Sequence, residues 1–402
     1  MNVPKLRFKE FDGEWTRYYL GENAEIKGRV GWKSLKRNEY IDEGPNMIAG
    51  KHINNGTINW EKVDHIPKWR YEESPEIMLE NDDVIFSKDG SLGNPAIIRE
   101  LPGESTINST MMLVRTGDDI DSEFFYQILL GPQFKRLIYL KVSGSSIPHL
   151  FQADMKEFSF LAPLFEEQKK ISQFLSVLDK KIQLQQQKID LLQEQKKGYM
   201  QKIFKQEWRF KEFTQQWKTT TIGSLAEISR GASPRPIQDP KWFDGNSNVG
   251  WLRISDVTKQ NGRIHYLEQK ISILGQEKTR VLETPHLLLS IAATVGKPVI
   301  NYIPTGVHDG FLIFYNPTFN VEFMFQWLEM FRDNWQKYGQ PGSQVNLNSE
   351  LVKNQEISIP VIEEQQKIAE FLTLMDKKIQ LQKEKLELLK KQKQGFMQQM
   401  FI

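Results

Sequence analysis

Several loops in this sequence combine arginine, lysine, serine and glycine, the residue types that suit contacts with phosphate groups and with base edges. Arginine can donate two hydrogen bonds to a guanine edge, while lysine and serine suit phosphate oxygens. The candidate DNA-binding residues are Arg29, Lys33, Lys51, Lys88 and Ser145 in the N-terminal half, and Arg230, Ser233, Arg235, Arg253, Ser290 and Lys297 in the C-terminal half. A single basic loop is more often plain solvated surface. The interpretation therefore depends on the recurrence of such loops at matching places in both halves.

Motifs that would indicate catalysis are absent or incomplete. Residues 293–298 resemble a phosphate-binding loop but lack its first glycine and the hydroxyl residue after the lysine. Residues 316–319 read Asn-Pro-Thr-Phe, which lacks the second proline of the Asn-Pro-Pro-Phe motif of amino-group DNA methyltransferases. The six histidines are scattered and there is no cysteine, so no metal-ligand pattern is indicated. We expect no catalytic residue, no metal and no cofactor.

Short apolar runs and glycine turns alternate in each half, which predicts a mixed body of strands and helices. The predicted strands are 83–87, 96–98, 110–114 and 158–162 in the first half, and 286–290, 299–300, 311–315 and 357–359 in the second. Helical patterns occupy 122–140 and 321–338. The fold class expected is α+β.

The chain repeats itself. Residues 163–204 and 360–401 are identical at 24 of 42 positions, with an offset of 197 and no gap. Leu6–Trp15 (LRFKEFDGEW) likewise returns as Trp208–Trp217 (WRFKEFTQQW). A repeat unit of about 200 residues is far longer than solenoid periods, so it indicates a duplication of domains.

Both repeated segments have the 3.5-residue apolar spacing of a coiled coil. The predicted seam is Ile171, Leu175, Leu178, Ile182, Ile189 and Leu192, repeated as Ile368, Leu372, Met375, Ile379, Leu386 and Leu389. Gln185 and Lys196 interrupt it, as do Gln382 and Lys393 at the same heptad sites. Each helix would be about 60 Å long. Antiparallel pairing of the two helices is the simplest arrangement; a solvated helix or a homodimer zipper is the alternative.

Composition places the chain among multidomain intracellular proteins. It has 402 residues, of which 26% are charged and 39% hydrophobic, with a net charge of +2, which suits two or more soluble domains. No window approaches the roughly 18 apolar residues of a membrane span, and the N-terminus has no apolar signal region. We therefore expect a cytoplasmic protein without membrane contact.

Certain motifs resemble those of a known family. Both long segments begin with Pro-x-x-Glu-Glu-Gln-x-Lys-Ile, at 163–171 and 360–368. The second body has Gly-Ala-Ser-Pro at 231–234 and Trp-Leu-Arg-Ile-Ser-Asp at 251–256. With the duplication, these motifs resemble the specificity subunits of type I restriction-modification systems over essentially the whole chain. The first body departs from the pattern, because no Ser-Pro follows Lys27-Gly28-Arg29.

The resemblance implies an architecture and a function. Two similar target-recognition domains, 1–162 and 207–359, would be separated by long helices, 163–206 and 360–402, which form an antiparallel coiled coil with pseudo-two-fold symmetry. The chain would be a non-catalytic subunit that recognises an asymmetric, bipartite site on double-stranded DNA. It would bind two methyltransferase subunits and the endonuclease/translocase subunits. The competing hypotheses are a coiled-coil scaffold whose bodies bind proteins, and an enzyme that acts alone.

Overall fold

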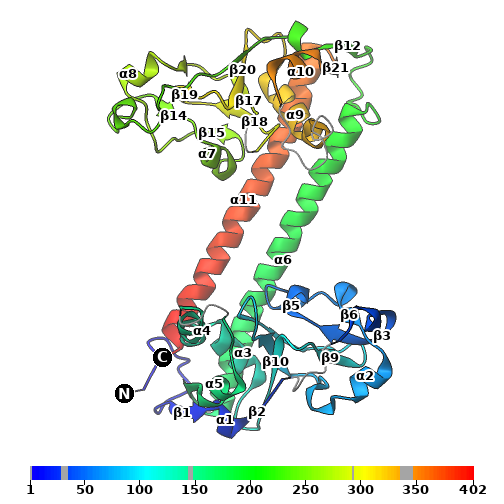
Figure 1. The fold of residues 1–402 in the computed structure, drawn as a ribbon, viewed down its shortest axis with the longest axis vertical. Coiled ribbons are helices and arrows are strands. Elements are labelled where there is room, and N and C mark those ends of the chain that lie inside the picture. The colour runs from blue at the N-terminus through cyan, green and yellow to red at the C-terminus, as the bar shows by residue number, and fades with distance from the viewer. Residues whose placement is uncertain (1, 29–34, 144–147, 292–293, 336–346) are drawn as a thin grey trace. The chain divides into compact units, whose positions relative to one another are not determined.

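The computed structural model describes residues 2–28, 35–143, 148–291, 294–335 and 347–402 (Figure 1). The chain forms two compact units: Met1–Gln186 with Glu384–Ile402, and Gln187–Lys383. Each unit combines one globular body with a portion of both long helices. The boundaries of the compact units therefore run through the helices rather than at their ends.

A four-stranded antiparallel sheet forms the centre of the first body. Its strands, in spatial order, are β2 (Ala24–Lys27), β10 (Met111–Thr116), β7 (Val84–Ser87) and β8 (Gly93–Ile97). Alternate residues of β10 enter different cores: Met112 and Val114 pack into one cluster and Met111 and Leu113 into another. The sheet is thus buried on both faces, which is why its strands read as continuous apolar runs.

The first of these two clusters includes α3 (Ser122–Leu130) and Phe134 of α4 (Pro132–Ser143). The other includes residues of β3 (Ile41–Ile48) and β9 (Ser105–Ile107), which form a smaller sheet with β6 (Asp64–His65). The remaining helices and strands of this body are α1 (Leu20–Asn23), α2 (Lys68–Glu72), α5 (Gln152–Glu157), β1 (Thr16–Tyr19), β4 (Ile53–Asn54), β5 (Thr57–Ile58) and β11 (Ser159–Ala162).

The second body repeats this plan. Its sheet has the order β13 (Glu227–Arg230), β20 (Phe311–Tyr315), β17 (Leu287–Ser290), β18 (Pro298–Asn301) and β15 (Arg263–Ile264). The helix α9 (Val321–Trp335) packs on one face. The remaining elements are α7 (Ile254–Lys259), α8 (Ile273–Gln276), α10 (Ser349–Asn354), β12 (Lys218–Thr221), β14 (Gly250–Trp251), β16 (Arg280–Leu282), β19 (Thr305–Val307) and β21 (Glu356–Ile359). The strands β13, β20, β17 and β18 correspond in order and direction to β2, β10, β7 and β8.

All eight predicted strands lie on observed strands, but the helix predicted over 122–140 is wrong in one respect. It divides into α3 and α4 at Gly131. Pro132 has no backbone N–H to continue the ladder, so the first helix ends before it. The helix predicted over 321–338 is α9, and the predicted part beyond residue 335 lies outside the described residues.

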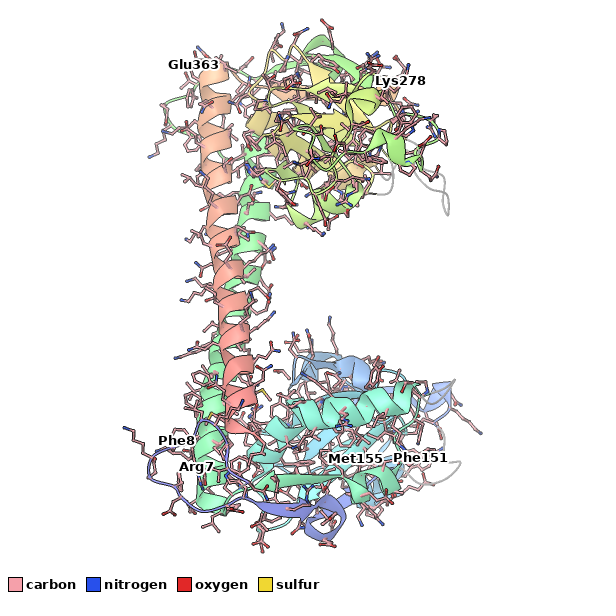
Figure 2. All side chains as sticks on the ribbon, turned by 90° about the vertical axis from the view of Figure 1, so that its left-hand side faces the viewer. Arg7, Phe8, Phe151, Met155, Lys278 and Glu363 are labelled. Carbon is pink, nitrogen blue, oxygen red and sulfur yellow. The ribbon has the colours of Figure 1, made fainter. Side chains whose placement is uncertain are left out.

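The long helices are α6 (Phe165–Phe204) and α11 (Ile362–Met400). Each is fixed at its start by the segment that leads into its own body. Arg7 binds Glu167 at 2.6 Å, and Arg209 binds Glu364 at 2.7 Å. Figure 2 labels Arg7 and Phe8 beside α6, where the Phe8 ring packs edge-on against Phe174. The duplication in sequence is therefore also a duplication of contacts.

Within each unit the two helices pair antiparallel. In the first unit, Asp179 binds Lys393 at 2.6 Å, and the Phe174 and Phe396 rings lie 4.9 Å apart. In the second unit the pairs are Asp376 with Lys196, at 2.6 Å, and Phe371 with Tyr199, at 5.2 Å. As the residue number rises along one helix, that of its partner falls. The predicted antiparallel pairing is confirmed, and the solvated single helix is wrong.

Seam positions are buried to different degrees. Ile171, Leu175, Leu178, Ile189, Ile368, Leu372, Ile379 and Leu386 are buried, whereas Ile182, Leu192, Met375 and Leu389 are half-buried. The lysines that interrupt the seam pair with aspartates of the opposite helix. Burial lowers the pKa of Lys393, and the nearby Asp179 partly offsets that effect. The seam thus combines buried apolar residues with an ion pair at each of its two lysine sites.

The seam can be tested at Leu372, which is fully buried against the second body. Leu372→Ala should cost about 2–5 kcal/mol, because it removes buried methyl groups and leaves a cavity. The matched control is Leu374→Ala on the same helix, where the side chain is 63% exposed and the change should stay within about 0.5 kcal/mol. Chemical denaturation followed by circular dichroism measures both. Equal effects at the two positions would contradict the observed packing.

No helix among the described residues is long and apolar enough to cross a membrane.

Candidate DNA interface

In the second body, loops that are distant in sequence meet at one edge of the five-stranded sheet. The strand register aligns Arg230 with Leu312 and Ser290 with Phe311. The Ser290 N–H donates to the carbonyl oxygen of Lys297 at 2.9 Å, which closes the turn between β17 and β18. We call this edge the second loop edge. It contains the segments that carry Arg230, Ser233, Arg235, Ser290 and Lys297.

Arg253 belongs to the same end of the body. It follows β14, which runs parallel to β19, and the Trp251 ring lies 5.8 Å from that of His308 just beyond β19. The guanidinium of Arg253 donates to Asp256 at 3.1 Å and to Glu268 at 3.3 Å. The hydrogen bond to Asp256 is the largest cause of a raised pKa at Arg253. Arg253 is therefore a cation already held by two carboxylates.

Asp309 connects three of the candidate residues, and sequence reasoning missed it. Ser233 Oγ donates to Asp309 Oδ1 at 2.8 Å, and Arg235 Nη2 donates to Oδ2 at 2.6 Å. Arg230 Nε donates to the backbone carbonyl oxygen of Asp309. Partial burial alone would raise the pKa of Asp309, but the Ser233 hydrogen bond and the two arginine charges outweigh it and lower that pKa. The carboxylate is therefore an ionised acceptor in the β19–β20 turn, in contact with the basic loop that carries Arg230, Ser233 and Arg235.

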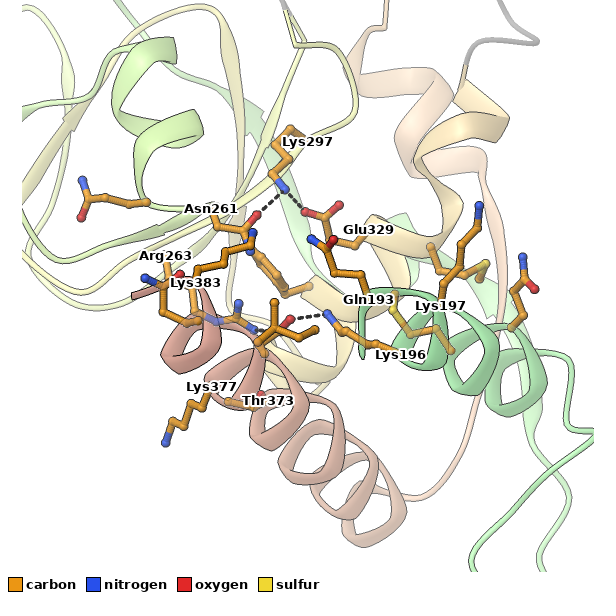
Figure 3. Close-up of a pocket in the computed structure, with 18 of the residues that line it drawn as sticks. Gln193, Lys196, Lys197, Asn261, Arg263, Lys297, Glu329, Thr373, Lys377 and Lys383 are labelled. Atoms are coloured by element: carbon orange, nitrogen blue, oxygen red, sulfur yellow. Dashed lines mark hydrogen bonds and ion pairs between the residues drawn. The ribbon is translucent and has the colours of Figure 1, made fainter. Parts of the chain in front are cut away.

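Two candidate residues are not presented to the surface. Ser290 is fully buried. The Lys297 side chain is only 13% exposed, because its Nζ pairs with Glu329 of α9 and donates to Asn261 at 3.2 Å (Figure 3). Lys297 thus fastens the β17–β18 turn to α9. In this arrangement the Ser290 side chain is inaccessible to solvent, and the Lys297 ammonium is already paired with a carboxylate.

A basic groove of about 1120 Å³ adjoins Lys297 within the second unit (Figure 3). Its wall joins the body to the helices, because Asp376 accepts from both Lys196, at 2.6 Å, and Arg263, at 3.2 Å. Arg263 also binds Glu322 at 2.8 Å. Further lysines that line the groove are exposed: Lys197, Lys259, Lys377 and Lys383. The groove therefore offers cations beside the second loop edge.

The first body has an equivalent edge, which we call the first loop edge. The register aligns Ser87 with Met111, and the next N–H, of Lys88, donates to Thr110 at 2.8 Å. Lys51 follows β3, whose last residue pairs with the end of β9 beside this turn. The Lys51 ammonium is exposed and donates to Asp64 at 3.0 Å. Arg29, Lys33 and Ser145 lie outside the described residues.

A second surface runs along the long helices and meets the basic groove at Leu381, which lines both. Apolar side chains recur at every seventh position on the side away from the seam, and each is more than half exposed. They are Val177, Leu184 and Leu191 on α6, and Leu374, Leu381 and Leu388 on α11. We call them the outer stripes. Exposed apolar residues in such order indicate a surface that binds another protein. The signal was present in the sequence as a second seven-residue period.

Across the parts of the chain that the structure describes, no group of three or more His, Asp or Glu side chains could hold a metal ion.

The family model of the type I restriction modification DNA specificity domain matches the chain twice, over residues 13–194 and 214–391. The type I restriction enzyme MjaVIII specificity subunit of Methanocaldococcus jannaschii is 25% identical over 416 residues, which cover 96% of this chain and 89% of that relative. The putative MjaX specificity subunit of the same organism is 23% identical over 420 residues, covering 98% and 95%.

Solved structures share the fold. The S subunit of a type I restriction-modification system from M. genitalium has a TM-score of 0.63 at 16% identity, over 100% of this chain and 99% of that chain. A chain from a structure concerned with complex assembly and conformational transition of the type I system has a TM-score of 0.57 at 16% identity, over 95% and 96%.

Proposed function

Because the chain belongs to the type I restriction modification DNA specificity domain family, we propose that it recognises an asymmetric, bipartite DNA site and positions methyltransferase and endonuclease subunits there. Each body reads one half-site. The observation that carries the proposal is the convergence of basic loops at equivalent sheet edges in both bodies. Since the loop sequences differ between the bodies, the two half-sites differ as well.

The loop edges supply the contacts with DNA. In the second body Arg235 is 72% exposed, so it can reach base edges in the major groove, where arginine binds guanine. Arg230 and Ser233 contact the same residue, Asp309, as Arg235 does, and Arg253 is a further candidate in this body. The lysines of the basic groove suit phosphate contacts, which position a protein without reading sequence. In the first body Lys51 and Lys88 lie at the first loop edge. Arg29, Lys33 and Ser145 remain candidates from the sequence.

The outer stripes bind the methyltransferase subunits. A leucine at every seventh position can pack against an added helix in the manner of a coiled coil, and burying each one on assembly removes apolar surface from water. Methyl transfer and cleavage take place on the partner subunits. The chain itself contributes recognition and placement.

Footprinting tests this proposal. The chain, purified with its methyltransferase subunits, should protect a single split site, and protection should weaken steeply as salt rises, since phosphate contacts release counterions. A DNA of equal length with both half-sites scrambled is the control. Equal protection of both DNAs would contradict sequence recognition. Absence of protection on either DNA would favour the protein-binding scaffold instead.

A further inference from the structure

We infer that Asp309 is a positioning residue, which orients Arg235 to recognise a guanine in the half-site of the second body. The inference rests on the proposed function and deepens it, because it assigns one base type to one side chain. Asp309 was not among the candidate residues, and a carboxylate repels phosphate. Its place at the second loop edge therefore needs a reason.

The carboxylate of Asp309 is fixed on several sides. Its Oδ1 accepts a hydrogen bond from Ser233 Oγ at 2.8 Å, and the backbone N–H of Asp309 donates to the same Ser233 Oγ at 3.3 Å. The turn that carries it is closed by the Gly310 N–H, which donates to His308 Nδ1 at 2.9 Å. Burial lowers the pKa of His308, against the opposing charge of Asp309, and so favours the neutral ring, which can accept this hydrogen bond. The remaining acceptor, Oδ2, is directed to Arg235 at 2.6 Å.

This contact leaves the guanidinium available. Arg235 is 72% exposed, and Asp309 engages it through Nη2. No other partner of Arg235 occurs among the described residues. A guanidinium has five N–H donors in a rigid plane, so the contact through Nη2 restrains its orientation and leaves most of the donors unused. Guanine presents two acceptors, N7 and O6, at the spacing of such a pair of donors.

Orientation is what the carboxylate adds. A long, exposed arginine samples many rotamers, and ordering it on binding costs free energy. When Asp309 orients Arg235 before DNA binds, the entropic cost of binding is smaller. Bases whose edges do not match the two parallel donors of the guanidinium are then disfavoured. Arg230 Nε donates to the backbone carbonyl oxygen of Asp309, so a second positive charge lies next to Arg235. A contact with phosphate needs only a positive charge. An oriented guanidinium plane is instead suited to the two acceptors of a base edge.

Methylation kinetics of the assembled complex test the inference. Each base pair of the second half-site is substituted in turn, and kcat/KM is measured for each DNA. In the wild type, one G·C pair should show strong discrimination. Arg235→Ala should reduce that discrimination about tenfold or more and leave every other position unchanged. Arg235→Lys should not rescue it, because lysine lacks the planar fork.

Asp309→Asn should weaken discrimination at that same pair, with no change in melting temperature. The double variant of Arg235→Ala with Asp309→Asn should discriminate no less than Arg235→Ala alone, since both act through one contact. The matched control is Asp239→Asn, which removes a carboxylate paired with Lys241 at 2.9 Å in the same body. That variant should keep the wild-type profile.

Some outcomes would overturn the inference. A uniform loss over all positions with a lower melting temperature would make Asp309 merely structural. If Arg235→Ala left discrimination unchanged at every base pair, the inferred guanine contact would be refuted. The proposed function would be unaffected, because the wild type would still recognise a split site. Absence of any split site in the wild type is the distinct result that would contradict the proposed function itself.

Discussion

Exchanging residues 207–358 for the second body of another family member should change one half of the methylated site and leave the other half as it was. The physical reason is that the loop edge of this body is built from its own strands, and its apolar clusters draw on the second unit alone. The first loop edge uses none of those residues. Mapping of methylated adenines for the parent and the exchange variant measures the effect.

The donor body must preserve its attachments to the helices. Arg209 binds Glu364 at 2.7 Å, and Asp376 accepts from Arg263 at 3.2 Å and from Gln326 at 2.8 Å. A donor body with equivalents of Arg209, Arg263 and Gln326 should fold onto α6 and α11. A donor body without them is the control, and it should fail to assemble. Change in both half-sites after a well-assembled exchange would contradict the assignment of one half-site to each body.

Replacing two residues of the outer stripe on α11, Leu381→Glu with Leu388→Glu, should strongly weaken the binding of methyltransferase subunits without unfolding the chain. Both side chains are more than 60% exposed, so the free chain loses little. In an assembled complex each buried leucine contributes about 1.5–3 kcal/mol. Losing both should weaken binding roughly a thousandfold. Co-purification and calorimetric titration measure the affinity of the chain for the methyltransferase subunits.

The matched control for this stripe is Gln392→Glu, an exposed site on the same helix outside the stripe. It introduces the same side chain and should leave assembly intact. Methylation should fall together with assembly in the double variant and remain at the wild-type level in the control. Retained binding by the double variant would show that the methyltransferase subunits use another surface.

The paired helices were predictable because heptad spacing and an ungapped repeat are properties of sequence alone. Their ion pairs were not predicted. Lys196 and Lys393 were recognised as polar seam residues, but their partners, Asp376 and Asp179, follow only from the antiparallel register. The division of the 122–140 helix could have been foreseen, since Pro132 follows Gly131 and cannot continue an α-helical ladder.

The candidate site shows the limit of residue-type reasoning. Ser290 and Lys297 have suitable chemistry, yet one is buried and the other is paired with Glu329. The burial of Ser290 and the pairing of Lys297 depend on how the β17–β18 turn packs against α9, and a local sequence pattern does not predict that packing. Asp309 is the reverse case: it was not among the candidates, and only the strand register brings it into contact with both Arg230 and Arg235.

Genome-wide methylation mapping, in cells that carry this chain with its methyltransferase subunits, tests the central claim most directly. We predict one asymmetric motif, with two different half-sites separated by a spacer of unspecified sequence, and its loss when the chain is deleted. A continuous or palindromic motif, or methylation that persists without the chain, would contradict the claim that this chain reads DNA through two unlike bodies.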